Sequence, residues 1–556
     1  AKAPSSHACL PSCVLQSPTI DSPPYSPSPR GTGRCMPEKR PLARALTVSG
    51  FWRPHRSSGC SAPAPHPSHR PIMRSPELLL GPLLVATALI FAGEVQASRE
   101  GEADPRWRQA AAPASGGVAM TPPMGWNSYD AFDWNVTEAE FLANAEYVAE
   151  NLLPFGYDTV TVDFYWYHPI RGPIEVDGYG RPLPAKDRFP SGFKHLADKV
   201  HSLGLKFGIH IMRGINSNAV DAQSPVLGAP GVTADQVYAP GSHCPWGPPA
   251  EPSQFYALNM SEPGAQEFLN SLAAQYASWG VDYIKNDCVY GGDYIPTNVD
   301  GFSAAILKAG RPMAYSLSPG DWGLDMARAG HVAGHVSAYR VSADVWDTWP
   351  RDHFAVAARH ASSGLLGAAS TLGRSWPDLD MLPLGVVGFK GSRHRATLSP
   401  MEAESVFALW SFAKSPLILG SLLTEMDAWT LRLVTNRDLL FVDQHSLNNA
   451  AVRTITGREA VWRADAPPGE GPGGPGATFY AGLFNLEDPP AAPRDVSVAM
   501  EDLGVGWEGT VCDAYDVLGM SKLPPMRGTV RGAAPIPPHG VTVIRLTGTL
   551  RSPKAA

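Results

Sequence analysis

The chain reads Ser261-Glu-Pro-Gly-Ala-Gln-Glu-Phe-Leu-Asn-Ser-Leu-Ala-Ala-Gln-Tyr-Ala-Ser-Trp-Gly-Val-Asp-Tyr-Ile-Lys-Asn-Asp-Cys288, and this stretch predicts a helix followed directly by a strand. Apolar residues recur at helical spacing from Leu269 to Trp279, and Gly280 ends the helix. Val281-Asp-Tyr-Ile then begins a strand that closes on Asp287. A helix that leads into a strand ending in an acid is typical of repeated strand and helix units.

The same alternation recurs earlier in the chain. Thr137-Glu-Ala-Glu140 is a capping box that predicts a helix, and the β-branched run Thr159-Val-Thr-Val-Asp163 predicts a strand. A second helix ends at Gly204 and precedes Leu205-Lys-Phe-Gly-Ile-His-Ile. Such alternation requires a parallel sheet covered by helices, and the best fit is an α/β fold, a (β/α)8 TIM barrel. Its strands are expected near Met124, Val160, Phe207, Tyr283, Ala314, Ala338, Leu372 and Leu417.

The barrel is expected to span residues 118–442 and to be followed by a second domain. After Val442 the helical period fades, and short strands such as Thr478-Phe-Tyr-Ala-Gly-Leu-Phe-Asn surround a Pro/Gly-rich loop. Residues 443–549 are therefore predicted to form a C-terminal antiparallel β-sandwich, and residues 550–556 a tail.

The first 117 residues have a different composition. Residues 1–72 are rich in Pro, Ser, His and Arg and start with Ala1, so we expect a disordered or spurious upstream segment. Residues 73–97 combine Met-Arg-Ser-Pro-Glu with an apolar run and a small-residue end at Ala97, which predicts a signal peptide. The apolar run is shorter than a membrane span, so no membrane association is expected after cleavage. Residues 98–117 are a linker.

Charge and motif content exclude several classes of protein. The net charge is -7, and the globular part has no dense basic run, which argues against nucleic acid as a partner. The 16 His show no metalloprotease spacing, and no serine-hydrolase elbow, P-loop or dinucleotide fingerprint occurs. We therefore expect no metal and no cofactor.

Two aspartates have the layout of a two-carboxylate glycoside hydrolase. Asp287 lies two residues after Lys285, and Asp344 lies four residues after Arg340. Lys285 should point to the same side of its strand as Asp287 and favour its ionised form. The alternative interpretation is that both aspartates cap the helices that follow them.

Three further motifs are Thr121-Pro-Pro-Met-Gly-Trp-Asn-Ser, Gly204-Leu-Lys-Phe-Gly-Ile-His and Ser375-Trp-Pro-Asp-Leu-Asp-Met-Leu. Together with the segments around Asp287 and Asp344, they resemble the melibiase family of retaining α-galactosidases, glycoside hydrolase family 27, over residues 118 to 548. The plant branch is most similar, because it carries Arg-Gly-Ile after the third strand and Tyr-Ser-Leu-Ser-Pro-Gly after the fifth. Some members of that branch act on β-L-arabinopyranosides.

The resemblance implies a site for each part of the reaction. Asp287 matches the family nucleophile and Asp344 the acid/base, which must carry a proton at rest. Asp378 is expected to be structural. Trp126 would pack on the sugar, with a core anchor as the alternative interpretation. The substrate-binding residues implied are Trp126, Asp163, His210, Lys285, Ser318, Arg340 and Asp380.

Three positions depart from the family pattern. Phe164 stands where many α-galactosidases carry a second acid, His210 replaces a tyrosine, and Ser318 replaces a frequent Glu. All three changes concern the terminal sugar, and a pocket lacking a hydroxyl partner tolerates a sugar lacking that hydroxyl. We therefore expect hydrolysis of terminal non-reducing α-D-galactose, with β-L-arabinopyranosidase activity as the alternative. An α-N-acetylgalactosaminidase or a non-catalytic galactoside-binding protein is less favoured.

Cysteines and glycosylation motifs indicate the compartment. After removal of the signal peptide three Cys remain, and the resemblance implies a disulfide between Cys244 and Cys288, leaving Cys512 free and buried. Asn135-Val-Thr and Asn259-Met-Ser are glycosylation acceptors. We expect the secretory pathway, with the cell wall, extracellular space or vacuole as destination. The partners would be galactose-containing oligosaccharides, polysaccharides or glycoconjugates. The oligomeric state is left open.

Overall fold

The computed structural model describes most of the chain after residue 116. The described residues are 117–170, 173–244, 255–289, 294–318, 325–469, 477–504 and 511–548. The predicted upstream segment 1–72, the predicted signal peptide 73–97, the linker as far as residue 116 and the tail 550–556 lie outside them. No helix in the described ranges is both long and apolar enough to cross a membrane.

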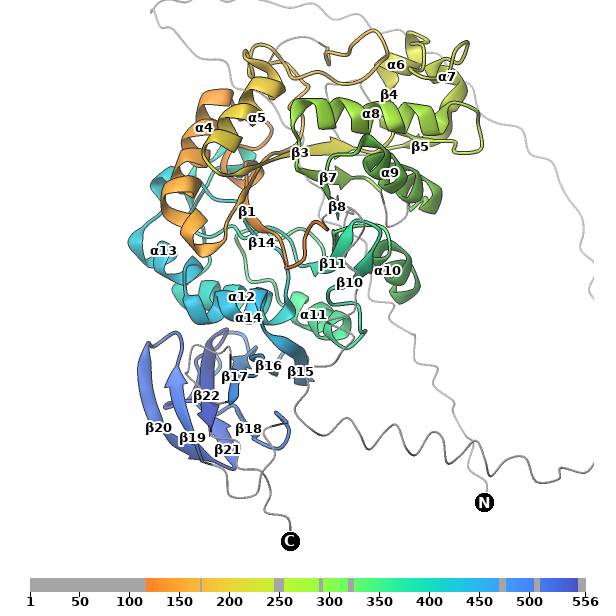
Figure 1. The fold of residues 1–556 in the computed structure, drawn as a ribbon. Helices are drawn as coiled ribbons and strands as arrows, with labels where there is room; N and C mark the ends of the chain where they lie inside the picture. Colours follow the sequence, from red (N-terminus) through yellow and green to blue (C-terminus); the bar gives the residue numbers. More distant parts are fainter. Residues whose placement is uncertain are drawn as a thin grey trace, which may run out of the picture. The chain divides into compact units, whose positions relative to one another are not determined.

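A curled sheet of nine strands forms the centre of the described structure (Figure 1). Its order is β10-β11-β9-β8-β7-β3-β2-β1-β14, and every pairing except β10 with β11 is parallel. A single parallel bridge between Leu382 and Leu419 links the segment after β11 to β14. The strands are β1 (Met124–Asn127), β2 (Thr159–Val162), β3 (Lys206–Met212), β7 (Tyr283–Asp287), β8 (Ala314–Ser318), β9 (Ala338–Arg340), β10 (Ala368–Ser370), β11 (Gly373–Asp378) and β14 (Leu417–Leu419). All eight strand positions expected from the sequence are present, and the sheet fits a (β/α)8 barrel.

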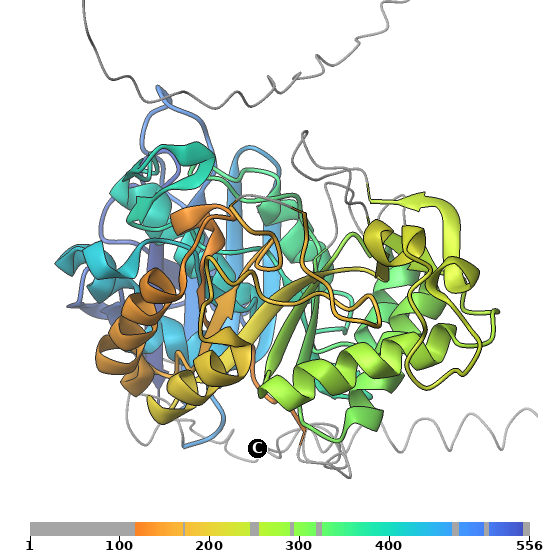
Figure 2. The same ribbon diagram turned by 90° about the horizontal axis from the view of Figure 1, so that it is seen from above.

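Helices lie outside this sheet in Figure 1, and in the view of Figure 2 the light-green helix α8 runs alongside it. The main helices are α4 (Glu138–Tyr147), α5 (Gly192–Ser202), α8 (Ala265–Trp279), α9 (Pro296–Ala309), α10 (Met326–Ala333), α11 (His353–Ala361) and α12 (Pro400–Ala413). Shorter helices are α3 (Tyr129–Phe132), α6 (Ser217–Asp221), α7 (Ala234–Val237), α13 (Ala428–Val434) and α14 (Arg437–Gln444).

Local sequence explains where these helices begin and end. Thr137 caps α4 through the predicted capping box, in which its hydroxyl accepts from the Glu140 N–H. Helix α8 buries Leu269 and Leu272, as the apolar stripe predicted. Gly280 ends α8 with a φ of 88°, a conformation that glycine adopts without a steric penalty.

A small antiparallel sheet between β3 and α8 was not predicted from the sequence. It consists of β4 (Ile215–Asn216), β5 (Tyr238–His243) and β6 (Phe255–Leu258), in the order β4-β6-β5. Its strands are short and lack a clear polar and apolar alternation, so they gave no period-2 signal. Strand β5 ends immediately before Cys244 and therefore positions one half of the disulfide. A hairpin of β12 (Val386–Val387) and β13 (His394–Arg395) is equally short.

The C-terminal region is antiparallel β-structure. A six-stranded sheet has the order β15-β16-β17-β22-β19-β20, and β18 pairs with β21 in a second sheet. Val461, Leu483 and Ile544 of the first sheet share a core with Val498 and Val530 of the second. Helix α14 ends at Gln444, and β15 begins at Leu447. The strands are β15 (Leu447–Ile455), β16 (Glu459–Asp465), β17 (Ala477–Asn485), β18 (Ser497–Ala499), β19 (Val511–Asp516), β20 (Ser521–Arg527), β21 (Thr529–Arg531) and β22 (Val541–Gly548).

Ion pairs join this β-domain to helices of the barrel. Arg545 on β22 places Nη1 2.7 Å from both carboxylate oxygens of Asp438 on α14. The Tyr480 hydroxyl donates to the same carboxylate at 2.8 Å. In the segment before β22, His539 Nδ1 lies 2.7 Å from Glu402 Oε1 at the start of α12. These contacts are partly buried, so the β-domain supports the barrel helices through oriented polar contacts.

His360 in α11 is expected to make the folded protein less stable in acid. Its side chain is 1% exposed, and neither ring nitrogen has a hydrogen-bond partner among the described residues. Burial, assisted by Arg359, lowers the pKa of His360 from 6.5 to about 4. Between these values the unfolded chain binds a proton that the folded chain does not, so stability falls as pH falls, by about 3 kcal/mol over the interval.

Denaturant unfolding near neutral pH and at about pH 4 measures this loss. The variant His360→Phe is expected to lose less stability over the interval than the wild type, because phenylalanine binds no proton. His195→Ala, which removes an exposed histidine on α5, serves as the matched control and should behave like the wild type. An equal loss in His360→Phe and the wild type would contradict the assignment.

Candidate active site

Charged side chains gather at the carboxyl ends of the parallel strands. Asp163 follows β2 directly, and Asp287, Ser318 and Arg340 are the last residues of β7, β8 and β9. Because the carboxyl ends of parallel strands meet at one edge of the sheet, residues far apart in sequence converge there. Strand register supports this, since Asp287 pairs with Ser318 in β8. Asp344 and Asp380 lie in the segments that follow β9 and β11.

Asp163 and Lys285 form a buried ion pair. The Lys285 ammonium lies 2.9 Å from Asp163 Oδ2, and Asn127 donates to the same oxygen at 2.6 Å. The Phe164 N–H donates to Asp163 Oδ1 at 2.7 Å. Burial opposes ionisation of Asp163, but Lys285, His210 and these hydrogen bonds outweigh it and lower its pKa to about 2. Burial would likewise lower the pKa of Lys285, but Asp163, Asp380 and Asp287 raise it above its ordinary value. Both groups are therefore charged at neutral pH.

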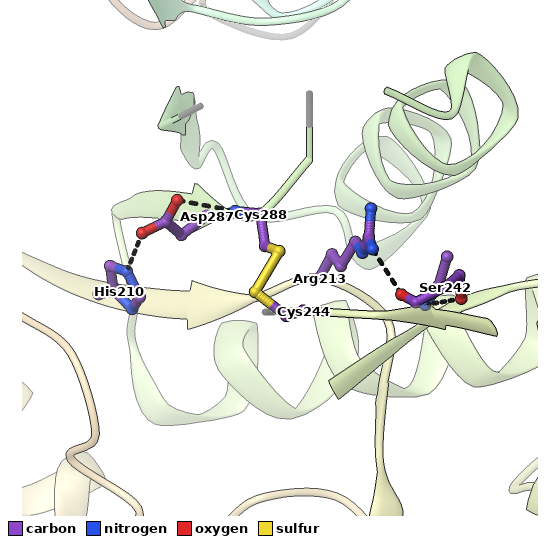
Figure 3. The surroundings of a disulfide bond; sticks show 7 residues. His210, Arg213, Ser242, Cys244, Asp287 and Cys288 are labelled. Carbon is purple, nitrogen blue, oxygen red and sulfur yellow. Dashed lines mark hydrogen bonds and ion pairs between the residues drawn. A yellow bond between two sulfur atoms is a disulfide. The ribbon is translucent and has the colours of Figure 1, made fainter. Parts of the chain in front are cut away.

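The direct partner of Asp287 is His210 on β3, as Figure 3 shows. His210 Nε2 lies 3.3 Å from Asp287 Oδ2, and the Cys288 N–H donates to Asp287 Oδ1 at 2.7 Å. The Asp287 side chain is 20% exposed, so it is reachable from solvent. Lys285 was expected to favour the ionised form of Asp287. Its hydrogen bond is to Asp163, and the charge of Asp287 is one of those that raise the pKa of Lys285.

A disulfide joins Cys244 to Cys288, as the family resemblance implied (Figure 3). It links the end of β5 to the residue directly after Asp287, with a Cα–Cα distance of 6.0 Å. Arg213, at the end of β3, donates from Nη2 to the Ser242 carbonyl at 2.5 Å. The disulfide thus fastens the inserted sheet to the residue after the nucleophile candidate, and Arg213 fastens it to the end of β3. Cys512 is the free, buried cysteine expected from the sequence.

Arg340 lies between two carboxylates. Its Nη1 is 2.7 Å from Asp380 Oδ1, and its Nη2 is 3.1 Å from Asp344 Oδ1. The other oxygen of Asp380 accepts the Val345 N–H at 2.7 Å, so Asp380 fixes the backbone next to Asp344. Burial raises the pKa of Asp380, and Arg340 partly offsets that effect. Asp380 is 5% exposed, whereas Asp344 is 47% exposed.

The backbone is strained at Cys288, which follows Asp287, and at Asp380, whose carboxylate accepts the Val345 N–H next to Asp344. Asp380 has a φ of 93° and Cys288 a φ of 59°, values that residues with a Cβ rarely adopt. Asp380 is held there because its N–H donates to Asp378 and its carbonyl accepts from Trp410, both at 2.8 Å. The Asp378 carboxylate thus helps to hold this backbone conformation. The disulfide constrains Cys288 in the same way.

A cavity of about 20 Å³ connects several of these groups. This volume is about that of a single water molecule. The residues that line it include Lys285, Ser318, Arg340, Asp380 and Met381. The cavity thus brings together residues from β7, β8, β9 and the segment after β11.

Neither aspartate caps a helix. Helix α9, which follows Asp287, has Ile295 at its N-cap, and α11, which follows Asp344, has Asp352 there. The alternative interpretation of Asp287 and Asp344 as helix caps is therefore wrong. Their side chains are left accessible at the edge of the sheet.

Trp126 was predicted to pack on the sugar, with a core anchor as the alternative interpretation. Its side chain is fully buried, and its indole N–H donates to the Ser421 carbonyl at 2.8 Å. Phe141 packs against the ring with centroids 5.6 Å apart. This burial favours the core anchor, and the contact with the sugar stays a prediction.

Two polar residues of the site were missed from the sequence. Asn127 orients Asp163, and its position at the end of β1 could have indicated this role. Asp130 is fully buried, and among the described residues its Oδ2 has no hydrogen-bond partner. Burial and the charge of Asp380 raise the pKa of Asp130 well above its ordinary value. Nothing in the spacing of α3 distinguishes Asp130 from an exposed helix acid.

Comparisons with known proteins agree with this fold. The alpha galactosidase A (melibiase) family matches residues 121–223 and 257–445. The α-galactosidase of Cyamopsis tetragonoloba is 27% identical over 78% of this chain and 88% of its own length. Alpha-galactosidase 2 of Arabidopsis thaliana is 29% identical over 60% of this chain and 68% of its own. A family 27 β-L-arabinopyranosidase from Geobacillus stearothermophilus, solved with arabinose, is 34% identical with a TM-score of 0.69, and the match covers 77% of this chain and 97% of that one.

The barrel-like sheet, with accessible and buried acids at its carboxyl edge, and these matches define a glycoside hydrolase. Its substrates are galactose-containing carbohydrates. The chain belongs to the melibiase family of α-galactosidases.

Proposed function

We propose that the protein is a retaining exo-glycosidase that removes terminal, non-reducing α-D-galactose through a covalent glycosyl-enzyme intermediate. Asp287 is the nucleophile and Asp344 the acid/base. One observation carries the proposal. Among Asp163, Asp287, Asp344 and Asp380, the first and last are buried, and protein groups contact both oxygens of each, whereas Asp287 and Asp344 are accessible. The two accessible carboxylates are the ones free to reach a substrate.

The reaction has two steps in this arrangement. A carboxylate oxygen of Asp287 attacks the anomeric carbon while the bond to the aglycone oxygen breaks and Asp344 donates its proton to that oxygen. Asp344 then takes a proton from water, which attacks the same carbon and releases Asp287. Two inversions return the original anomeric configuration.

The neighbours of these acids support their roles. His210 Nε2–H can donate to Asp287 Oδ2 and stabilise the carboxylate. Arg340 and Asp380 hold the segment that carries Asp344. Asp163 and Lys285 present a charged pair able to bind sugar hydroxyls, because each retains unused hydrogen-bonding capacity.

The pocket for the terminal sugar favours a second substrate, β-L-arabinopyranose, which is galactose without its hydroxymethyl arm. Phe164 packs its ring edge against His210, with centroids 5.3 Å apart, where many α-galactosidases carry an acid. An aromatic ring cannot accept a hydrogen bond from a hydroxymethyl group as a carboxylate does. The likeness to a β-L-arabinopyranosidase points the same way.

A panel of nitrophenyl glycosides tests the proposal. We expect kcat/KM for the β-L-arabinopyranoside to lie within about tenfold of that for the α-D-galactoside, since one missing hydroxyl partner is worth about 1 to 3 kcal/mol. The α-N-acetylgalactosaminide should be the poorest of the three. Hydrolysis of the galactoside alone, with the arabinopyranoside untouched, would refute the broadened pocket.

The variant Phe164→Asp is the matched probe of this pocket. Restoring a carboxylate is expected to raise the preference for the galactoside over the arabinopyranoside by about fivefold or more. Ile170→Asp, at an exposed residue a few positions farther along the chain, introduces the same charge away from the strand end and should leave the ratio unchanged.

The proposal also includes the architecture of the two domains and the cellular compartment of the protein. The eight parallel strands form a closed (β/α)8 barrel, and residues 443–549 form a β-sandwich that supports it. The disulfide favours an oxidising compartment and hence the secretory route, to the cell wall, extracellular space or vacuole. Asn135 is exposed, and Asn259 is partly exposed, which suits both as glycosylation sites.

A further inference from the structure

Two histidines and one aspartate converge between helices α9 and α10, away from the residues assigned to the sugar. His331 lies in α10, His335 lies two residues beyond its end, and Asp300 lies in α9. A spacing of four residues places both imidazoles on one side of α10. Their ring centroids are 4.6 Å apart. His331 Nε2 is 2.9 Å and His335 Nε2 is 3.5 Å from the same oxygen, Asp300 Oδ1.

These distances match the edges of a zinc tetrahedron. Two ligand atoms that each lie about 2.0 Å from a tetrahedral Zn²⁺ are about 3.3 Å apart. The two nitrogen-to-oxygen separations bracket that value, and all three ligand atoms lie within 4.8 Å of one another. Two imidazoles with one carboxylate is a ligand set that zinc accepts, with water in the fourth position.

The carboxylate oxygen at the centre of the cluster is unsatisfied. Asp300 Oδ1 is shielded from solvent, yet among the described residues it accepts no hydrogen bond of good geometry. The two nearby nitrogens approach it closely without the alignment that a hydrogen bond needs. A buried acceptor in this condition is explained by an ion that both nitrogens and the oxygen would coordinate.

The Nδ1 atoms of both imidazole rings already have hydrogen-bond partners, which fix the orientation of the rings. His335 Nδ1–H donates to the His331 carbonyl at 2.9 Å, which leaves the lone pair on Nε2 pointing toward Asp300. His331 Nδ1 is hydrogen-bonded to the Tyr294 hydroxyl, which accepts the Nδ1–H when Nε2 coordinates. Metal-binding histidines usually have such a partner on the second nitrogen, because it fixes the tautomer and the orientation of the ring.

The surrounding charges permit a cation. The positive charge of Arg328 is paired with an acid, because its Nε lies 3.2 Å from Asp325 Oδ2, and its guanidinium lies over the Tyr294 ring. The His331 and His335 side chains are each 31% exposed, and Asp300 is 45% exposed, so an ion can enter from solvent.

We infer that Asp300, His331 and His335 form a zinc site that clamps α9 to α10. Sequence spacing had indicated no metal, because Asp300 is about thirty residues from the histidines. The clamp joins the helices that follow β7 and β8, the strands that end in Asp287 and Ser318. Its role is to hold that side of the barrel together, so zinc should raise stability. This inference does not depend on the proposed reaction.

Zinc titration of the full-length protein, stripped of metal with a chelator, tests the inference. Isothermal titration calorimetry with zinc chloride should show one site, and a saturating concentration should raise Tm by a few degrees, because an ion that binds only the folded state stabilises it. Magnesium chloride should do neither, since Mg²⁺ prefers oxygen ligands. A Co²⁺-loaded sample should show the visible absorption of a tetrahedral site.

Variants locate the binding. The double variant His331→Ala/His335→Ala should weaken zinc binding by about 100-fold or more, and Asp300→Asn, which keeps the side-chain size, by about tenfold or more. His195→Ala is the control and should bind as the wild type does. Circular dichroism tests whether each variant is folded. If the double variant is unfolded, zinc binding of Asp300→Asn alone tests the inference. Absence of zinc binding in the wild type, or unchanged binding in the folded ligand variants, would overturn the inference.

Discussion

The substitution Asp287→Asn is expected to reduce kcat/KM for an aryl α-D-galactoside by about 10⁴-fold or more, equivalent to about 5.5 kcal/mol of transition-state stabilisation. An amide is a far weaker nucleophile than a carboxylate, so the covalent intermediate should not form. Binding should survive, because Asp163, Lys285 and Arg340 stay in place. Steady-state kinetics measure the loss, and calorimetric titration with galactose measures the retained affinity.

The stereochemistry of rescue identifies the nucleophile directly. In Asp287→Ala, azide can occupy the space of the missing carboxylate and attack the α-galactoside from that side, giving the β-galactosyl azide by a single inversion. Asp221→Asn, at an exposed position at the end of α6, is the control and should keep wild-type activity. Activity of Asp287→Asn within tenfold of the wild type would refute the assignment.

Replacing Asp344 with Ala should have an effect that depends on the leaving group. A galactoside whose aglycone needs a proton to depart is expected to lose about 10²- to 10⁴-fold in kcat/KM, the usual contribution of a general acid. A dinitrophenyl galactoside needs no proton to depart, so its kcat/KM should change little. Its kcat should still fall, because the second step lacks a base to activate water.

Rescue with azide also distinguishes the acid/base from the nucleophile. In Asp344→Ala the covalent intermediate forms, and azide attacks it to give the α-galactosyl azide, with retention. The product is thus opposite to that expected from Asp287→Ala. An identical loss for both leaving groups, or β-azide from the Asp344 variant, would contradict the acid/base role. Asp352→Asn, in the same segment before α11, is the matched control.

The buried charges around these two acids explain why they remain available. Asp163 and Asp380 each engage both carboxylate oxygens with protein groups, and in doing so they fix Lys285 and Arg340. A positive charge held rigidly at the strand ends stabilises negative charge without reorganisation during the reaction. The accessible acids therefore work beside cations that were ordered by folding.

Much of the fold could be predicted from the sequence. The capping box at Thr137 and the apolar stripe of α8 produced helices where they were expected, and the eight strand positions were all found. These signals depend on the period of apolar residues and on capping groups, which act within a few residues. The inserted sheet was missed because its strands show no clear alternation of polar and apolar residues.

The candidate site was predicted less completely. Family likeness indicated Asp287, Asp344 and the disulfide between Cys244 and Cys288, and the structure contains that disulfide. The sequence could not predict which acid each charged side chain of the site would pair with. Lys285 lies two residues from Asp287 in sequence but bonds to Asp163, which is 122 residues away.

The sequence by itself determined the order of strands and helices and the presence of an acid at several strand ends, because these follow from patterns confined to short stretches. Only the tertiary structure decided that Asp163 takes Lys285, that His210 faces Asp287 and that Trp126 is enclosed in the core. The physical reason is that pairing depends on the register of neighbouring strands, and burial depends on which helices cover them. Asp300, His331 and His335 meet for the same reason, since packing of α9 against α10 creates a cluster that no single segment contains.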